Sequence, residues 1–361
     1  MSTVNVGIVG VGNCASSLVQ GVEFYGAEGA DPAGLPNPVC AGYSVADVRF
    51  TSAFDVDSCK TGRDLSEAIW AGPNNARRFA DVPWLGVPVT EGFLGDGVGR
   101  TTADRIDARG SASAAEIAAR LTDSGTQVLV NFLPVGSPRA TERYAEAALL
   151  AGCAFVNCMP AEIARSPHWA ERFRRAGLPL VGDDLRSQFG STLVHHALLD
   201  ALARNGVRLR STYQLNNGGN MDFLAMQDPE RLRSKQQTKA QGMAGGSGAE
   251  GSGAGALPAA AVHVGAEYIP FLEDRKVAFI RLEAAAFGGT PLEIELRMTV
   301  DDSPSAAGNV LDAVRYAKFA LEQGISGVFD PVSALLMKAA PRPMTGDAAL
   351  AELHALTGGP V

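Results

Sequence analysis

The strongest constraint on this fold is a β-branched strand that runs directly into a glycine turn and a helix. Val4–Val9 is apolar, and the residues GVGNCASSLVQGVEFY follow it. Within them Gly10, Gly12 and Ala15 form the pattern GxGxxA. Glycine lets the backbone approach a pyrophosphate, and the helix N-terminus supplies free N–H groups and a favourable dipole. The segment therefore predicts a dinucleotide-binding unit.

A second strand predicts which dinucleotide is bound. Val48–Phe54 is strand-like and ends at Asp55, where a carboxylate can accept both ribose hydroxyls and repel a 2′-phosphate, which favours NAD over NADP. The insertion from Gly26 to Gly42 lengthens the usual separation of about 20 residues between turn and acid. Ligands bind at the carboxyl edge of such sheets, where a later loop and a strand end also lie. The expected cofactor residues are Gly10, Gly12, Asn13, Cys14, Asp55, Pro134 and Asn157.

The order of strands and helices predicts an α/β protein with an insertion. Apolar strands at 127–133, 155–157 and 180–182 alternate with helices, which is typical of a doubly wound parallel sheet. Leu292–Val300 instead alternates apolar and polar residues, as in a half-exposed antiparallel strand. Helical periodicity returns over Ala307–Gln323. A second domain with an open sheet therefore follows the first, and the last residues could rejoin the first domain.

Composition limits the partners and the compartment. The chain has 361 residues, 46% of them hydrophobic, and no apolar run near the roughly 18 residues of a membrane span. It carries no export signal, and its five cysteines form no CxxC pair, so a reducing, cytoplasmic location is expected. A formal net charge of −8 disfavours nucleic acid as a partner. We expect a small-molecule ligand and no membrane association.

Lysines are scarce, so their positions are informative. Only six of the 31 basic residues are lysine. Arginine stays protonated, whereas a desolvated lysine can transfer a proton, so chemistry can require an amine where charge alone does not. Lys235 and Lys239 are four residues apart and would share one helix face. Lys60 and Lys318 lie outside every motif, and we expect arginine to replace either with little effect.

Several motifs resemble one family of enzymes. GVGNCASSLVQGVE, AFDVD, LPVGS, GDDLRSQ, NNGGNMDF, SKxxxK, DRK, DSP and LMKAAP occur along almost the whole chain. Their order, and nearly their spacing, are similar to those of the actinobacterial branch of the myo-inositol-1-phosphate synthases. Four of the six lysines match the family's active-site lysines, namely Lys235, Lys239, Lys276 and Lys338.

The resemblance implies a fold and an assembly. An interrupted Rossmann domain, residues 1–190 plus 305–361, would hold NAD. An inserted α+β mixed-sheet domain, residues 191–304, would carry the active site and build a homotetramer. The glycine-, serine- and alanine-rich segment 241–261 is expected to be a flexible loop that closes over substrate. A divalent or monovalent cation is a possible second cofactor, and no compact metal-ligand motif identifies its site.

The resemblance also implies a redox-neutral cyclisation of glucose 6-phosphate to 1D-myo-inositol 3-phosphate. C5 is oxidised, C6 becomes acidic, the enolate attacks the C1 aldehyde, and C5 is reduced again. Lys235 and Lys338 would lie around the C5 oxygen, and Lys276 would polarise the aldehyde oxygen. The implied catalytic residues are Lys235, Lys239, Lys276, Lys338, Asp184 and Asp302, with Asp184 also beside the nicotinamide. The implied substrate-binding residues are Ser187, Asn216, Asn220, Lys239 and Asp274.

Departures from the family pattern keep two alternatives open. Cys14, Arg186 and the segment 236–238 differ from residues common in relatives, and DSPSAAG replaces DSPNSAG. Some of these changes border the substrate, so a homologue that cyclises another sugar phosphate is an alternative. Fructose 6-phosphate, closed to a five-membered cyclitol phosphate, is one such substrate. The other alternative is an NAD-binding dehydrogenase or sensor without cyclase activity, which would not need four amines in one site.

Overall fold

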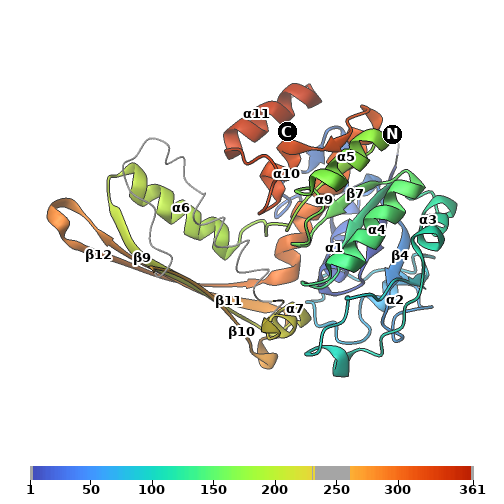
Figure 1. Cartoon of the computed structure of the whole chain (residues 1–361), viewed down its shortest axis with the longest axis horizontal. Helices are drawn as coiled ribbons and strands as arrows, with labels where there is room; N and C mark the ends of the chain where they lie inside the picture. The colour runs from blue at the N-terminus through green and yellow to red at the C-terminus, as the bar shows by residue number, and fades with distance from the viewer. Residues whose placement is uncertain (1–2, 230, 232–260, 359–361) are drawn as a thin grey trace.

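Two β-sheets organise the molecule (Figure 1). The computed structural model describes residues 3–229, 231 and 261–358. A seven-stranded parallel sheet forms the compact half, and a four-stranded sheet extends away from it as a long arm. The lysine segment 235–239 and residues 241–260 of the predicted loop lie outside the described residues.

The parallel sheet has the strand order β13-β8-β7-β6-β1-β4-β5. Chain order reverses at β1, whose neighbours are β4 and β6, and this switch point is where such sheets bind ligands. Apolar β-branched residues fill these strands because both faces are covered by helices. The strands are β1 (Val4–Val9), β4 (Val48–Asp55), β5 (Val89–Glu91), β6 (Val128–Asn131), β7 (Ala154–Asn157), β8 (Pro179–Val181) and β13 (Gly327–Val328).

Helices cover the parallel sheet on both faces. One core layer packs the sheet against α1, α9, α10 and α11, and the other packs it against α3, α4 and α5. These helices are α1 (Asn13–Gly26), α3 (Ala114–Asp123), α4 (Pro138–Ala151), α5 (Pro167–Ala176), α9 (Asp302–Glu322), α10 (Asp330–Leu336) and α11 (Gly346–Thr357). The short α2 (Leu65–Ala68) and the pair β2 (Val39–Cys40) and β3 (Tyr43–Ser44) lie in the connections around β4.

The second sheet is mixed. It has the order β10-β9-β11-β12, in which β9 and β10 are parallel and the other pairs antiparallel. Its strands are β9 (Arg208–Gly218), β10 (Val262–Tyr268), β11 (Arg275–Ala285) and β12 (Pro291–Asp301). Helix α6 (Ser191–Arg204) packs on one face around Leu202, Ile280 and Leu282, and α7 (Met221–Ala225) follows β9. The arm thus has one covered face.

The predicted fold class, an interrupted Rossmann domain with an inserted mixed sheet, is confirmed. Ser113 and Glu116 form a capping box at the start of α3, and Gly152 ends α4 in the left-handed conformation. One boundary is wrong: α9 begins at Asp302, five residues before Ala307. Pro304 hides this start, yet proline is tolerated in a first helical turn because that turn's N–H groups lack intrahelical partners. The division at residues 190 and 305 stays a prediction.

No helix within the described part of the chain combines the length and apolar character needed to traverse a bilayer.

Candidate active site

The glycine turn leaves open space at one glycine and not at the other. Gly10 has φ +85° and hydrogen-bonds to Phe54, and a Cβ there would lie 2.9 Å from the carbonyl oxygen of Phe132. Gly12 is the N-cap of α1, and a Cβ there would meet nothing within 4 Å. Gly10 is therefore required by the protein backbone itself. The space at Gly12, in front of a helix N-terminus, fits the pyrophosphate of a dinucleotide.

Asp55 lies at the end of β4 as predicted and fixes the same turn. Its Oδ2 accepts the N–H of Val11 at 2.7 Å, and its Oδ1 accepts the N–H groups of Val56 and Asp57 at 2.8 and 2.9 Å. The carboxylate is therefore held by backbone donors beside the glycine turn.

The other predicted cofactor residues at this edge differ in exposure. Pro134 is half-buried in the loop after β6. Asn157 is fully buried, accepts from Asn131 at 2.9 Å and donates to Asp183 at 2.7 Å. Its amide therefore braces the loop ends of β6, β7 and β8.

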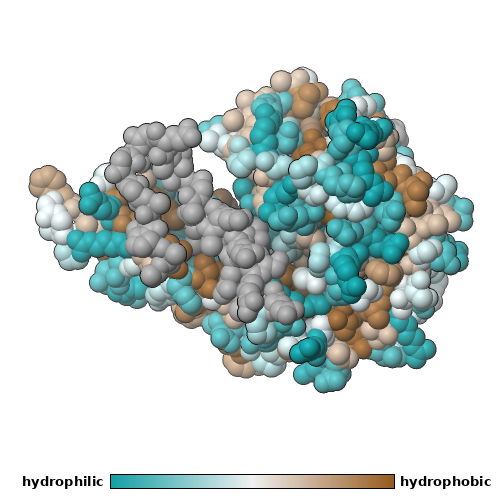
Figure 2. Space-filling view, in the orientation of Figure 1, coloured by the Kyte–Doolittle hydropathy of each residue, from teal (hydrophilic) through white to brown (hydrophobic). Residues whose placement is uncertain are grey.

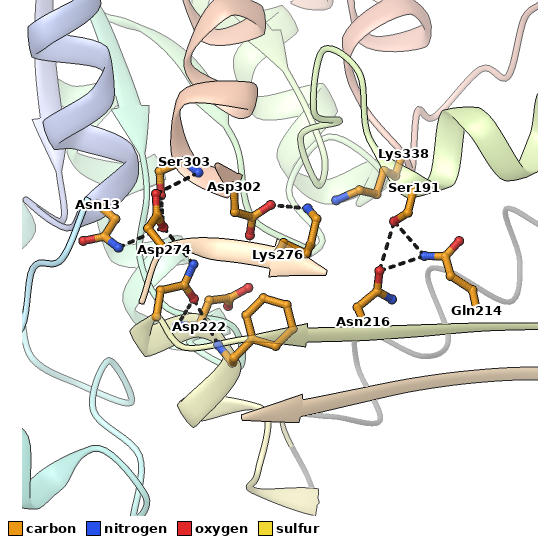
Figure 3. A network of polar contacts seen from close by, with 12 residues as sticks. Asn13, Ser191, Gln214, Asn216, Asp222, Asp274, Lys276, Asp302, Ser303 and Lys338 are labelled. Carbon is orange, nitrogen blue, oxygen red and sulfur yellow. Dashed lines mark hydrogen bonds and ion pairs between the residues drawn. The ribbon is translucent and has the colours of Figure 1, made fainter. Parts of the chain in front are cut away.

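Asp274 is a buried carboxylate on which three parts of the chain converge (Figure 3). Its Oδ1 accepts from Asn13 at 3.0 Å, from Asn220 at 3.0 Å and from the Ser303 hydroxyl at 2.8 Å. Burial, followed by the negative charge of Asp302, raises the pKa of Asp274 to about 6. This carboxylate joins the start of α1 to the inserted sheet and to α9.

Two lysines form ion pairs beside Asp274. The ammonium of Lys276, the second residue of β11, contacts Asp302 Oδ1 at the start of α9. The Lys338 ammonium lies 2.9 Å from Asp184 Oδ1. Figure 3 shows the Lys276 amine directed to Asp302 and the Lys338 side chain extending toward the same region. Two ammonium groups that carboxylates hold in position in a mostly buried site are suited to stabilising negative charge that develops on a substrate oxygen.

Backbone pairing places Lys338 against the GDD motif. The N–H groups of Lys338 and Ala339 donate to the carbonyls of Asp184 and Asp183 at 2.7 and 3.1 Å. Asp184 has φ +61°, a strained conformation for a residue with a side chain, and strain of this kind is concentrated at functional sites. Its Oδ2 is buried and lacks a hydrogen-bond partner among the described residues. That oxygen can accept a ligand hydroxyl.

A buried polar network supports the inserted sheet behind the lysines. Asn216 accepts from Ser191 at 3.0 Å and from Gln214 at 3.2 Å, and His195 contacts Gln214 and Thr212. Burial lowers the pKa of His195, so the ring is neutral near pH 7. This agrees with a structural histidine.

Two further predicted residues lie near the N-termini of helices, Ser187 before α6 and Cys14 in α1. Ser187, half-buried, is in the loop just before α6, against Gly190. Cys14 begins α1, where burial and then the charges of Asp274 and Asp302 raise the pKa of its thiol to about 12. The Cys14 thiol is therefore protonated and is a poor nucleophile.

The sequence analysis missed several residues of this site. Ser303 and Asp222 lie inside quoted motifs but received no role, and Asn75 exchanges hydrogen bonds with Asn13 at 2.6 and 2.9 Å. Asn75 belongs to an irregular loop, so no periodicity could reveal it. Lys60 and Lys318 received no role either, yet both are buried, with 5% and 6% of their surface exposed. Lys235 and Lys239 lie outside the described residues.

Within the described residues, no three His, Cys, Asp or Glu side chains are grouped so that they could hold a metal ion.

Comparisons with known proteins agree with this geometry. The sequence model of the family "Myo-inositol-1-phosphate synthase" matches residues 190–303. The chain is 46% identical to an inositol-3-phosphate synthase of Mycolicibacterium smegmatis over 99% of this chain and 98% of that protein. It is 45% identical to the enzyme of the same name from Corynebacterium glutamicum over 98% of each chain.

The chain belongs to the myo-inositol-1-phosphate synthase family.

Solved structures of similar proteins have the same fold. The crystal structure of Ari2 is 34% identical, with a TM-score of 0.79, and the match covers 99% of this chain and all of that one. A myo-inositol-1-phosphate synthase-related protein from Thermotoga maritima is 27% identical, with a TM-score of 0.78 over 99% of both chains. The family's architecture therefore extends over the whole described chain.

The two glycines should separate folding from cofactor binding. Gly10→Ala should lower the free energy of unfolding by about 1–3 kcal/mol, because its Cβ meets a backbone oxygen at positive φ. Gly12→Ala should leave that energy within about 0.5 kcal/mol and raise the Kd for NAD at least ~10-fold. Urea denaturation and calorimetric titration measure the two effects. If Gly12→Ala bound NAD as tightly as the wild type, the space at Gly12 would not be the pyrophosphate site.

Asp274 should make stability depend on pH. Its folded pKa lies above the value of 3.8 for the unfolded chain, so the folded state binds more protons between about pH 4 and 6. Stability should therefore fall as pH rises through this window, and the Asp274→Asn variant should lack that contribution. The difference in unfolding free energy between the two proteins should change by up to about 3 kcal/mol between pH 4 and pH 7.

Urea denaturation at several pH values measures this change, with the exposed Asp104→Asn as control. Parallel curves for the wild type and Asp274→Asn would show that Asp274 titrates as an ordinary carboxyl group.

Proposed function

We propose that this chain is an NAD-dependent inositol-3-phosphate synthase that cyclises glucose 6-phosphate to 1D-myo-inositol 3-phosphate. The observation that carries the proposal is the pair of mostly buried ammonium groups, Lys276 on Asp302 and Lys338 on Asp184, whose side chains extend toward the same region in Figure 3. The family relationship supplies the reaction, and the relatives named inositol-3-phosphate synthase support this product.

NAD fits the residues at the switch point of the parallel sheet. The space at Gly12 takes the pyrophosphate, and Asp55 takes the ribose hydroxyls. When bound, NAD would accept a hydride from C5 and return it after ring closure. Asp184 follows β8 and Lys338 follows α10, and the two residues form an ion pair there. They are placed to contact the reacting end of the sugar.

We assign the lysines the roles that the family resemblance implies. Lys338 holds the C5 oxygen, since its ammonium has donors left after the contact with Asp184. Lys276 polarises the C1 aldehyde oxygen and stabilises the alkoxide that forms when C6 attacks C1. Asp302 and Asp184 orient the two amines and limit the net charge of the site. Lys235 and Lys239, outside the described residues, keep their implied roles at the C5 oxygen and the phosphate.

The inserted sheet supplies a surface for assembly into a homotetramer. One face packs on α6, but the opposite face presents Leu215 and Phe279, which are paired neighbours on β9 and β11 and are 36% and 37% exposed. Figure 2 shows this arm projecting from the body with hydrophobic residues at its tip, where Phe287 is 99% exposed. An open sheet face with apolar residues is suited to pack against a second copy.

Product analysis tests the reaction. The protein is incubated with NAD and either glucose 6-phosphate or fructose 6-phosphate, and the products are identified by phosphorus and carbon NMR. We expect a six-membered cyclitol phosphate from glucose 6-phosphate and no net change in absorbance from NADH, because the cofactor is recycled. A five-membered cyclitol phosphate from fructose 6-phosphate would favour the alternative cyclase, and stoichiometric NADH would favour a dehydrogenase.

Arginine substitution tests whether the lysines act in catalysis. Lys276→Arg keeps the charge but changes its shape and fixes its proton, so it should lower turnover at least ~100-fold with NAD binding little altered. Lys338→Arg and Lys235→Arg should behave alike. Lys318→Arg is the control, since Lys318 pairs with Glu322 on α9, and its turnover should stay within about twofold. Equal turnover for Lys276→Arg and the control would refute the catalytic assignment.

A charge on the open sheet face should break the assembly. Phe279→Glu should reduce the particle mass in light scattering from that of a tetramer to that of a dimer or monomer, because a carboxylate would be buried at the interface. Trp84→Glu changes a residue that is 71% exposed and lies outside the inserted sheet, and it should leave the mass unchanged. A monomeric wild type would overturn the assembly proposal and leave the reaction untouched.

A further inference from the structure

Lys60 is a buried cation at the ribose end of the candidate cofactor site. It follows β4, and only 6% of its side chain is exposed. Its ammonium donates to Asn74 Oδ1 at 3.2 Å and lies 3.9 Å from Asp55 Oδ2. Because a buried ammonium is costly without a partner, its place beside the expected ribose-binding carboxylate calls for an explanation. The catalytic scheme above makes no use of it.

The two partners of Lys60 also hold the glycine turn. The N–H of Val11, between Gly10 and Gly12, donates to Asp55 Oδ2 at 2.7 Å. The carbonyl oxygen of Val11 accepts from Asn74 Nδ2 at 2.9 Å. Lys60 therefore lies against both side chains that fix the backbone in front of the pyrophosphate space. A displacement of its ammonium would therefore change the position of Asp55 at the ribose end and of Asn74 at the turn.

We propose that Lys60 is a cofactor-specificity residue, which acts as the counter-ion of Asp55 at the ribose end of the dinucleotide site. This inference rests on the NAD-binding function proposed above. It adds the Lys60 ammonium to Asp55 as a second charged group that affects the choice of nucleotide. Asp55 excludes a 2′-phosphate by repulsion, whereas Lys60, on the same oxygen of that carboxylate, attracts one. The preference for NAD over NADP is then set by how far the repulsion from Asp55 exceeds the attraction from Lys60. Asp55 thus also cancels a cation that would otherwise accept NADP.

A purely structural Lys60 would behave differently. If its ammonium only held Asn74 and the turn, its removal would weaken NAD and NADP binding by the same factor, because both nucleotides share the pyrophosphate. If it acts at the ribose, its removal weakens NADP binding more, because NADP alone carries the additional phosphate. The ratio of the two dissociation constants separates these roles.

The test is a double-mutant cycle on the full-length protein with NAD and NADP as the titrated ligands. Asp55→Asn should shift the ratio of Kd values toward NADP at least ~10-fold, because it leaves the Lys60 ammonium uncompensated. Adding Lys60→Met should reverse most of that shift. Adding Lys60→Arg instead should preserve it, which guards against loss of binding through misfolding. Lys318→Met, a change at a second buried lysine that lies outside the motifs, should leave the ratio unchanged.

Each outcome has a separate meaning. Equal ratios for Asp55→Asn and for the double variant with Lys60→Met would overturn the specificity role, even if both bind weakly. A wild type that binds neither NAD nor NADP would instead overturn the proposed function. A wild type that binds NAD, together with a cycle in which Lys60 changes both constants equally, would reduce Lys60 to a structural lysine.

Discussion

One buried carboxylate, Asp274, holds the candidate site together. Its donors come from the first turn of α1, from the loop after β9 and from the start of α9, so three distant segments meet on a single side chain. Such a group is costly to bury as an anion, and the rise of its pKa to about 6 reflects that cost. The hydrogen bonds to Asn13, Asn220 and Ser303 offset it. This junction links the start of α1, next to the glycine turn, to the strand that carries Lys276.

The site also distributes charge in a consistent way. Each of three described lysines of the site forms an ion pair with one carboxylate, namely Lys276, Lys338 and Lys60. In a low-dielectric site, paired charges avoid the mutual repulsion that several bare ammonium groups would suffer. A partner carboxylate also fixes the direction in which the remaining N–H donors point. The carboxylates therefore position the amines, whose remaining N–H donors would contact substrate oxygens in the proposed reaction.

The sequence predicted those parts of the protein that follow from local rules. The strand at Val4–Val9, the turn at Gly10 and the position of Asp55 follow from period and turn chemistry, and the structure places them as expected. The grouping of Lys276 with Asp302 and of Lys338 with Asp184 needed the family motifs, because each pair joins residues from different elements.

Other contacts could not be predicted from the sequence. Asn74 and Asn75 lie in an irregular loop whose contacts are set by tertiary packing, and no pattern in that loop marks them. The burial of Lys60 could not be predicted for a related reason: the charge of a side chain does not reveal whether the folded interior supplies a partner for it.

The position of α9 in the chain has a consequence for how the protein reaches this state. The helix is buried over most of its length against α1 and the parallel sheet, yet it comes after the inserted residues 191–301. Six of the seven strands are made before the insertion, but the part of the sheet face that α9 covers beside α1 stays exposed until α9 docks. Closing so long a loop costs entropy before any contact compensates it, and such topologies fold slowly. We therefore expect completion of the Rossmann core to depend on the folding of the arm, because closure of the inserted segment brings α9 onto the sheet.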